Sequence, residues 1–367
     1  MSKVFFTDLH TCLGNGRLVK LERLLKNAGF DAIDFNEKFV AVKVHFGEPG
    51  NLSFLRSSYA KLVCDYIKKL GGRPFVCDCN TLYVGGRKDG LVHLDSAYTN
   101  GYNPLCTGVH TIIADGLKGL DERRVPVKNG EYIKEAKIGG AIMDADIIVS
   151  LSHFKGHECT GFGGALKNLG MGCGSRAGKM EMHSSGKPRV LTEKCIGCGK
   201  CLKICAHSGP VISGSKCVID HSKCVGGGRC IAVCPKDAIV AALDEANDIL
   251  NCKIAEYAQA VCQDRPHFHI SLVIEVSPYC DCHDENDIAI VPDVGMFASF
   301  DPVALDVACA DAVNSQEPVK GSVLHAHGNT HHDHFTDVSP NTNWKSAVEH
   351  AERIGLGSRE YELIAIK

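Results

Sequence analysis

Residues 147–153, with the sequence IIVSLSH, decide the fold class of this chain of 367 residues. The first three residues form an uninterrupted apolar run that is typical of a buried strand, and the run leads into Ser152 and His153. Buried strands of this kind belong to mostly parallel sheets that helices cover on both faces. The fold class then depends on whether helices and further strands alternate around this run.

Helices and strands do alternate on both sides of it. Gly29 and Gly71 end two of the predicted helices, and Asp301 followed by Pro302 is typical of the start of another. We therefore expect an α/β fold with a mostly parallel sheet. The predicted elements are helices over 18–28, 53–70, 246–261 and 302–313 and strands over 40–44, 74–77 and 270–274.

Cysteine is the outlier of the composition. The chain has 20 cysteines and 18 histidines, and its first residues lack the apolar segment of a secretory signal, so a disulfide framework is not expected. Thiolates and imidazoles in these numbers indicate metal ligands, with iron and zinc favoured. Eight of the cysteines lie between Cys195 and Cys234, where large apolar residues are few, so we expect metal to hold this block together.

The first four cysteines of the block have the spacing of iron–sulfur ligands. Cys195, Cys198, Cys201 and Cys205 form the pattern C-x2-C-x2-C-x3-C. In bacterial ferredoxins three thiolates of such a loop hold one [4Fe–4S] cluster, and the fourth cysteine ligates the other cluster. A structural zinc site, the main alternative, normally has two cysteine pairs separated by a longer loop.

A second run of the same kind is incomplete. Cys224, Cys230 and Cys234 followed by Pro235 fit it, but Gly227 stands where its second cysteine belongs. Cross-ligation therefore gives one complete cluster and a second cluster with three cysteine ligands. The complete [4Fe–4S] cluster is assigned to Cys195, Cys198, Cys201 and Cys234, and the second cluster to Cys205, Cys224 and Cys230.

Four outcomes are open at the second cluster. It is a [3Fe–4S] cluster, or a [4Fe–4S] cluster in which one iron has a non-cysteine ligand or faces solvent, or Cys217 replaces the missing ligand, or the site is empty. An iron that faces solvent matters most, because a vacant metal position binds substrate as a Lewis acid does.

The cysteine block interrupts the predicted α/β domain. We expect an α/β domain whose first part is residues 1–188 and whose second part is residues 242–367, with an inserted ferredoxin-like iron–sulfur module over residues 189–241. The alternative is two separate α/β domains that flank the module.

Two further cysteine pairs each follow a predicted strand: Cys77 with Cys79, and Cys280 with Cys282. Sites in open α/β sheets form at the carboxyl edge of the strands, so the two pairs are candidates for one shared metal. Four thiolates suit a mononuclear iron, a zinc or a third iron–sulfur cluster. Two unconnected pairs of buried thiols are the other interpretation, and Cys159 and Cys173 are alternative partners.

The remaining cysteines are expected to be small core residues. They are Cys12, Cys64, Cys106, Cys252, Cys262 and Cys309. The stretch HAHGNTHHDH is expected to be a solvated loop rather than a divalent-metal site, and it contains His325, His327, His331, His332 and His334. His45 is a candidate for the same sheet edge as the cysteine pairs, with a satisfied core or turn histidine as the alternative.

Several motifs together resemble one family. SHFKGH over 152–157, GFGGALKNLGMG over 161–172, CDC over 280–282, PDVG over 292–295 and DPVA over 301–304 accompany the cysteine block. With that block they resemble the uncharacterised iron–sulfur family DUF362, over nearly the whole chain. The resemblance implies an α/β domain that carries a dicluster ferredoxin module, and it implies little about function. Gly227 departs from the usual eight-cysteine module.

A more distant resemblance is to the nickel-dependent lactate racemases. His157, the segment GFGGALK over 161–167 and His183 follow the order of a histidine, a glycine-rich segment and a second histidine in that family. There the lysine anchors a nickel pincer nucleotide, and the histidines serve metal binding and proton transfer. The resemblance implies a cofactor or anion site at His157, Lys167 and His183, where glycines allow close backbone approach. Helix packing is the other explanation of these glycines.

We therefore expect an iron–sulfur electron-transfer protein with a redox protein or a small molecule as partner. One alternative is a redox enzyme in which an open iron or a metal on the C-x-C pairs acts on a small anionic substrate, and another is a zinc-stabilised binding module. The formal charge of −3 gives no support for a nucleic-acid surface, and no apolar run approaches the roughly 20 residues that cross a bilayer. A cytoplasm poor in oxygen is the expected location.

Overall fold

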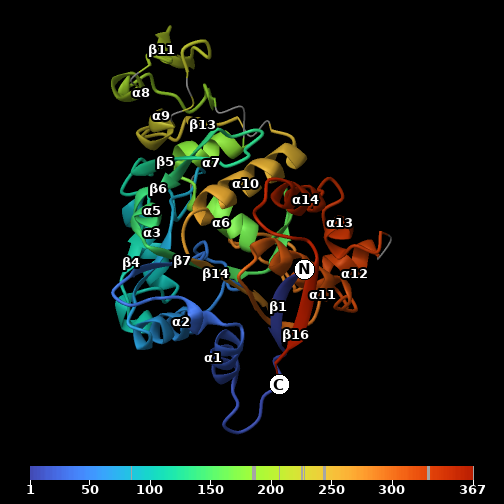
Figure 1. The fold of residues 1–367 in the computed structure, drawn as a ribbon. Helices are drawn as coiled ribbons and strands as arrows, with labels where there is room; N and C mark the ends of the chain where they lie inside the picture. Colours follow the sequence, from blue (N-terminus) through green and yellow to red (C-terminus); the bar gives the residue numbers. More distant parts are fainter. Residues whose placement is uncertain are drawn as a thin grey trace.

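A computed structural model describes residues 1–83, 85–183, 187–205, 207–224, 226, 228–242, 245–328 and 331–366. In this part of the chain an eight-stranded sheet runs through the centre of the molecule (Figure 1). Its strand order is β16-β1-β15-β14-β7-β2-β3-β4. The strands are β1 (Ser2–Thr7), β2 (Phe39–Lys43), β3 (Arg73–Asp78), β4 (Thr111–Ile113), β7 (Ile147–His153), β14 (His267–Val273), β15 (Gly295–Ser299) and β16 (Tyr361–Ala365).

The predicted α/β class with a mostly parallel sheet is confirmed. From β14 to β4 every neighbouring pair is parallel, and β16 is parallel to β1. Only β15 runs antiparallel to both of its neighbours, β1 and β14. The described residues between β14 and β15 contain no helix, and a parallel pairing would need a crossover connection, which is usually helical.

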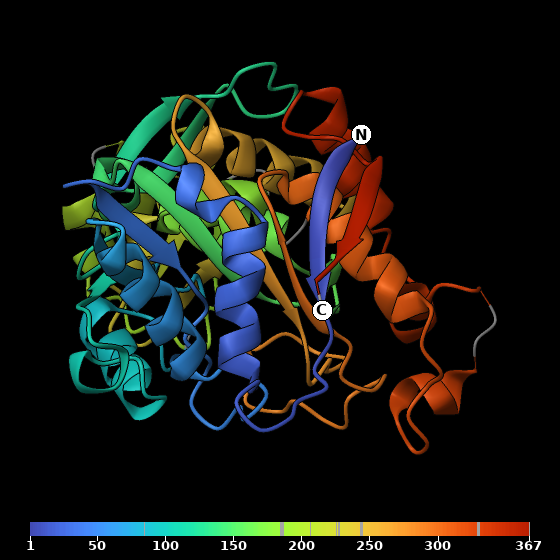
Figure 2. The same ribbon diagram turned by 60° about the horizontal axis from the view of Figure 1, so that its bottom comes forward.

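Two apolar cores lie on the two faces of the sheet. One core contains Ile148 of β7 and is covered by α6 (Ala165–Cys173), α10 (Asn247–Cys262) and α11 (Pro302–Asn314). The other contains Ile147 and Val149 and is covered by α1 (Arg17–Asn27) and α2 (Ser57–Lys69), as Figure 2 shows from the side of these two helices. Successive residues of a strand point to opposite faces, so a continuous apolar run such as that of β7 serves both cores.

Shorter elements complete the fold. The remaining helices of the main body are α3 (Gly90–Thr99), α4 (Pro104–Thr107), α5 (Gly140–Asp144), α7 (Arg176–His183), α12 (Val323–His327), α13 (His334–Val338) and α14 (Lys345–Arg353), with a 3-10 turn at Phe30–Ala32. Two small antiparallel pairs are β5 (Glu122–Pro126) with β6 (Glu135–Gly139), and β8 (Lys155–His157) with β9 (Gly161–Gly163).

The predicted elements occur with small differences in their bounds. Asp301 caps α11 as predicted, because its carboxylate accepts the N–H groups of Val303 at 2.8 Å and Ala304 at 3.0 Å. The helix predicted over 53–70 begins only at Ser57. The reason is that the side chain of Asn51 accepts the backbone N–H of Ser53 at 3.0 Å, which holds the chain in a turn.

The cysteine block forms a separate lobe beside α7 (Figure 1). Its first and last strands, β10 (Pro188–Val190) and β13 (Ile239–Ala241), pair with each other. Between them, β11 (Pro210–Ser213) and β12 (Lys216–Ile219) form a hairpin. A short helix follows each cysteine loop, namely α8 (Lys200–Ile204) and α9 (Arg229–Ala232). The buried cluster of this lobe contains four cysteines and includes Leu82 and Met180 of the main body. This composition agrees with the expectation that large apolar residues are few in the lobe. The division at residues 188 and 241 stays a prediction.

Within the described part of the chain, no helix combines the length and the apolar composition needed to cross a membrane.

Candidate functional site

The four cysteines assigned to the complete cluster lie around one pocket. Cys195, Cys198, Cys201 and Cys234 line it together with apolar side chains that include Ile212 and Ile239. Backbone N–H groups point at the sulfurs, because Cys217 N–H donates to Cys195 Sγ at 3.2 Å and Ala238 N–H donates to Cys234 Sγ at 3.2 Å. Hydrogen bonds from the backbone of Cys217 and Gly197 hold the pKa of Cys195 below its ordinary value. The pocket thus offers four sulfurs, with N–H donors on two of them.

The three cysteines assigned to the second cluster also lie near one another. The pKa of Cys230 is raised to about 12, first by burial and then by the nearby thiolates of Cys224 and Cys205. Gly227, on which the type of this cluster depends, lies outside the described residues. Cys217 lies with the first group instead, since its sulfur is 3.5 Å from Cys201 Sγ and its N–H points at Cys195.

A cavity of about 540 Å³ separates the cysteine lobe from the carboxyl edge of the main sheet. Its walls come from β10 and β13 on one side and from the ends of β2, β3 and β7, the β8–β9 pair, α6 and α7 on the other. Ile239 of β13 lines both this cavity and the cysteine pocket. The two spaces therefore share a wall.

Basic side chains dominate the charged groups of the cavity wall. Seven lysines and arginines line it against four aspartates and glutamates. Lys43 is committed to Asp78 at 3.0 Å, and Lys155 to Asp281 at 3.2 Å. Lys167 Nζ lies 3.5 Å from the sulfur of Cys280. Burial lowers the pKa of Lys167, but Cys280 and its acidic neighbours together raise it by more, so this side chain is an ammonium. The excess of positive charge favours a small anion as occupant.

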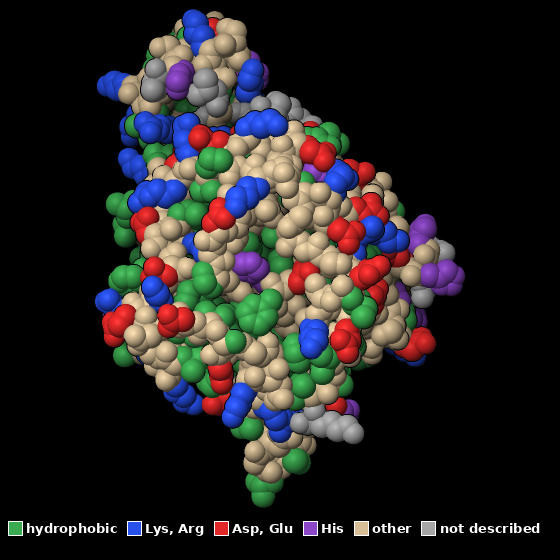
Figure 3. Space-filling model, viewed as in Figure 1, with side chains coloured by type: hydrophobic (Ala, Val, Ile, Leu, Met, Phe, Trp, Pro, Cys, Tyr) green, Lys and Arg blue, Asp and Glu red, His purple; other side chains and the backbone are tan. Residues whose placement is uncertain are grey.

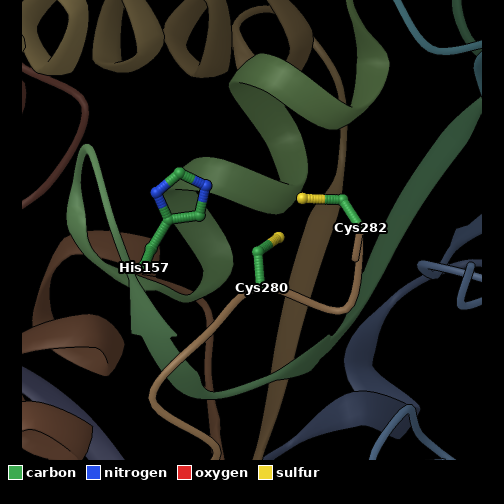
Figure 4. A group of neighbouring side chains, drawn as sticks. All are labelled: His157, Cys280 and Cys282. Carbon is green, nitrogen blue, oxygen red and sulfur yellow. The ribbon is translucent and has the colours of Figure 1, made fainter. Parts of the chain in front are cut away.

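His157, Cys280 and Cys282 form a sulfur–imidazole group beside this wall (Figure 4). Their ligand atoms all lie within 4.8 Å of one another, and His157 comes from β8 while both cysteines come from the loop after β14. Gly156 allows this close approach, because a Cβ there would lie 2.4 Å from the carbonyl oxygen of Pro278. The chain therefore carries a sulfur–imidazole group that is tight enough to hold a metal ion.

One of the two thiols in this group carries the negative charge. The S–H group of Cys282 donates to Cys280, and with Lys167 and His157 it holds the pKa of Cys280 well below its ordinary value. The same hydrogen bond to Cys280 raises the pKa of Cys282, and burial raises it further. At the rim of the group, Glu158 accepts a hydrogen bond from His283 at 2.9 Å. Burial raises the pKa of Glu158, but His157 and His283 lower it by more, to about 2.

The expectation that both C-x-C pairs share one metal stays a prediction. Cys77 and Cys79 lie at the end of β3 beside Cys173, whose carbonyl oxygen accepts from Cys79 Sγ at 3.4 Å. The loop that carries Cys280 and Cys282 contacts the end of β7 instead, where Asp281 accepts from His153 at 2.9 Å. No tight ligand group in the described chain combines cysteines from both pairs.

His157, Lys167 and His183 all line this cavity, and a cofactor or anion site at these residues stays a prediction. Burial and the nearby charges of Lys167 and His157 lower the pKa of His183 to about 3, so His183 is neutral. The glycines of this region are explained by packing: a Cβ at Gly164 would lie 2.3 Å from Asp306, and one at Gly170 would lie 2.1 Å from the carbonyl oxygen of Ile254.

The N-terminus of α6 is occupied by a side chain of the protein itself. Asp306 of α11 accepts the N–H groups of Ala165 at 2.6 Å and Leu166 at 2.9 Å. Burial raises the pKa of this carboxyl group to about 7. Lys167 lies in the first turn of α6, so Asp306 fixes the helix that carries it to the cavity wall.

The other predicted residues divide into confirmed and corrected cases. Cys64, Cys252, Cys262 and Cys309 are buried as expected, but Cys12 and Cys106 are exposed, since one lies in a loop and the other on the short helix α4. His45 lines the cavity and lies 2.9 Å from Arg87. The histidine-rich stretch is not a plain loop. Residues 325–327 belong to α12 and His334 begins α13, while the other described residues of the stretch lie between the two helices. His327, His331 and His334 bond to Asp337 and Gln316.

Sequence reasoning missed the residue that positions the cysteine pair at 280 and 282. Asp281 is completely buried between them and accepts from His153 at 2.9 Å and from Lys155 at 3.2 Å. Burial raises the pKa of Asp281, but these two basic groups lower it by more. The signal was present in the motif SHFKGH, where His153 and Lys155 alternate on one face of the chain as it leaves β7.

Comparison with known proteins gives one family and remote structural neighbours. The model of the domain of unknown function DUF362 matches residues 40–311. No curated protein matches the chain. The lactate racemase apoprotein from Thermoanaerobacterium thermosaccharolyticum is similar over 74% of this chain and 50% of its own, with 12% identity and a TM-score of 0.40. A protein from Thermotoga maritima is similar over 80% of this chain and 57% of its own, with 13% identity and a TM-score of 0.36. The chain thus spans about half the length of these neighbours, and likeness at this level carries no argument about cofactor or activity.

Proposed function

Because this chain belongs to the DUF362 family, whose description assigns no activity, we propose its function from its own residues: it is an iron–sulfur protein that passes electrons through the cysteine lobe to the cavity at the sheet edge. The match over residues 40–311 confirms the predicted membership in this family. The function rests on the arrangement of the thiols.

One observation carries the proposal. The four cysteines that the ferredoxin spacing assigns to one cluster line a single pocket, although Cys234 is 33 residues or more from the other three in sequence. Backbone N–H groups directed at Cys195 and Cys234 are the kind of donors that tune a cluster through its sulfurs. When bound, a [4Fe–4S] cluster supplies reversible one-electron transfer.

The spacing of the thiols favours a cluster over a zinc ion. A tetrahedral zinc with four thiolates draws its sulfurs to about 4 Å from one another. The tight ligand groups of the described chain include none of the cysteines between 195 and 234. Four cysteines that surround a pocket without closing on one another suit a larger inorganic core. Cys205, Cys224 and Cys230 are proposed to hold the second cluster.

The route of electrons follows from the shared wall and from the charge of the lobe. Ile239 of β13 lines both the cysteine pocket and the cavity. A single side chain therefore separates a cluster in the pocket from an occupant of the cavity. Residues 189–241 contain eight lysines and arginines against three aspartates and glutamates, a formal charge of +5. Figure 3 shows basic side chains over the lobe at the upper end of the molecule. An acidic redox protein is therefore the proposed electron donor.

The cavity supports a second candidate function, a redox enzyme that acts on a small anionic substrate. The observation that favours it is the size of the cavity, about 540 Å³, together with the excess of basic side chains in its wall. The two candidates are compatible, since the clusters would supply the electrons that the reaction consumes.

Iron and acid-labile sulfide analysis of protein purified under strict exclusion of oxygen tests the proposal. We expect about four irons for the complete cluster and about three or four for the second. Cys198→Ser should lose the iron of the first cluster, and Cys205→Ser should lose that of the second. Cys106→Ser removes an exposed thiol outside the lobe and should keep the iron of the wild type.

The outcome that rejects the proposal is equally clear. A folded protein with less than about one iron per chain, or with stoichiometric zinc in the lobe, has no cluster to transfer electrons. Equal iron in the wild type, Cys198→Ser and Cys205→Ser would place the iron elsewhere. Circular dichroism on each variant separates loss of the cluster from loss of the fold.

A further inference from the structure

The group of His157, Cys280 and Cys282 lies outside the cysteine lobe, with its ligand atoms within 4.8 Å of one another (Figure 4). Two kinds of chemistry fit such a group, namely binding of a metal ion and thiol–disulfide exchange. The hydrogen bonds around the group distinguish the two.

His157 is oriented against metal binding. Its Nδ1 accepts hydrogen bonds from the backbone N–H groups of Cys159 at 3.1 Å and Thr160 at 3.2 Å. A neutral imidazole that accepts at Nδ1 carries its proton on Nε2. Histidines that bind metal have the opposite arrangement, in which the ring nitrogen away from the metal donates to a neighbour. His157 therefore offers an N–H to the sulfurs instead of a lone pair to a metal.

Cys280 lies among donors that stabilise a thiolate. The ammonium of Lys167 is 3.5 Å from its sulfur, and the imidazole of His157 and the thiol of Cys282 approach it as well. Positive charge and N–H donors are what activate cysteines for exchange with disulfides. Cys280 itself is buried, whereas Cys282 is half-buried and lines the cavity, so Cys282 is the thiol that an occupant of the cavity meets first.

The backbone holds the two thiols in a geometry that a disulfide can bridge. The N–H of His283 donates to the carbonyl oxygen of Cys280 at 3.1 Å, which closes a four-residue turn. Such a turn keeps Cα atoms two residues apart within roughly the 4.4–6.8 Å that a disulfide needs. Asp281, clamped by His153 and Lys155, fixes this turn.

We propose that Cys280 and Cys282 are a redox-active dithiol that reduces a small anionic disulfide bound in the cavity. Cys282 passes its proton to the Cys280 thiolate along the hydrogen bond between them and attacks one sulfur of the substrate. The substrate S–S bond breaks, and the first thiolate leaves with the proton that Cys280 held, which restores the Cys280 thiolate. Cys280 then attacks the sulfur of Cys282 and releases the second thiolate as the S–S bond between Cys280 and Cys282 forms. The substrate gains two electrons, and the one proton of the pair leaves with the released thiolates. The basic excess of the cavity wall selects a substrate that carries negative charge.

Reopening the protein disulfide to one thiolate and one thiol takes two electrons and one proton. The proposed iron–sulfur centres supply the electrons one at a time through the shared wall at Ile239. Only this return step rests on the proposed function, because the oxidation of the dithiol needs the substrate disulfide alone.

Peptide mapping by mass spectrometry tests the inference on the full-length protein as purified without oxygen. The reduced protein is treated with glutathione disulfide, which is anionic, or with the uncharged 2-hydroxyethyl disulfide. We expect a bond between Cys280 and Cys282, formed at least about tenfold faster with glutathione disulfide. Cys280→Ser should instead accumulate a mixed disulfide of glutathione on Cys282. Cys106→Ser, which lacks an exposed thiol elsewhere, should react as the wild type does.

Two results would overturn the inference. In one, Cys280 and Cys282 stay reduced while the exposed Cys12 and Cys106 are modified. In the other, the protein binds one zinc per chain that Cys280→Ser releases, which makes the group a metal site. Iron and sulfide counted in the same sample keep the two proposals apart. If the protein holds no iron but forms the disulfide between Cys280 and Cys282, only the electron-transfer proposal is rejected. If it holds clusters but Cys280 and Cys282 do not react, only the dithiol proposal is rejected.

Discussion

Replacing Asp306 with asparagine probes how the fold holds the helix that carries Lys167. The carboxyl group of Asp306 is completely buried and accepts two backbone N–H groups at the start of α6. Burial favours the neutral acid, while the N–H donors and the helix dipole favour the carboxylate. Burial has the larger effect, since the pKa of Asp306 is raised to about 7.

The sign of the effect on stability follows from this direction. Between the unfolded pKa near 4 and the folded pKa of about 7, the native state keeps a proton that the unfolded state has released. Stability therefore falls as pH rises through this range, by about 4 kcal/mol in total, since each pKa unit is worth about 1.4 kcal/mol. Between pH 6 and pH 8 the loss is about 1.4 kcal/mol.

Urea unfolding of the wild type and Asp306→Asn at pH 6, 7 and 8 measures this term. The asparagine keeps one acceptor oxygen for α6 but does not titrate, so the difference between the two proteins cancels the other ionisable groups. We expect the advantage of the wild type to shrink by about 1.4 kcal/mol from pH 6 to pH 8. Parallel profiles, or an advantage that grows with pH, would show that Asp306 is an ordinary ionised cap.

Three further predictions concern the packing and charge around the cavity. Lys43→Met should destabilise the fold by about 3 kcal/mol, because the buried Asp78 loses its nearest cation, at 3.0 Å, and among the described residues keeps only Arg87 at 3.7 Å. Lys43→Met combined with Asp78→Leu should recover much of the loss in urea midpoint. Gly170→Ala should cost about 1–3 kcal/mol in the same assay, since its Cβ would overlap α10, whereas Gly16→Ala meets no atom within 4 Å and should change stability by less than about 0.5 kcal/mol. Reduction of the iron–sulfur centres by an acidic flavodoxin should slow at least about tenfold from 0.05 to 0.5 M salt because of the +5 charge of the lobe, and a rate independent of salt would reject an acidic donor.

The fold class could be predicted because local patterns determine it. The apolar run of β7, the alternation around it and the cap at Asp301 are signals carried within a few residues, and the structure confirms each of them. The sheet order is not local, and the sequence gives no signal for the strands that separate β3 from β14. For that reason the sequence predicts one shared site for the two C-x-C pairs, although β2 and β7 lie between β3 and β14, the strands that precede them.

The candidate site was predictable in part for the same reason. The spacing of the lobe cysteines is a local signal, and their pocket contains the four that cross-ligation assigns. The contact between His157 and Cys280 joins residues more than 120 positions apart, and only the close packing of Gly156 on Pro278 brings them together. No periodicity records such a contact, so His157 and the cysteine pair were predicted separately and for different sites.

Electron paramagnetic resonance of the dithionite-reduced protein tests the central claim most directly. The account predicts the signal of a reduced iron–sulfur cluster, lost or altered in Cys198→Ser and retained in Cys106→Ser. A folded, colourless protein that gives no such signal after anaerobic purification and reduction would contradict it.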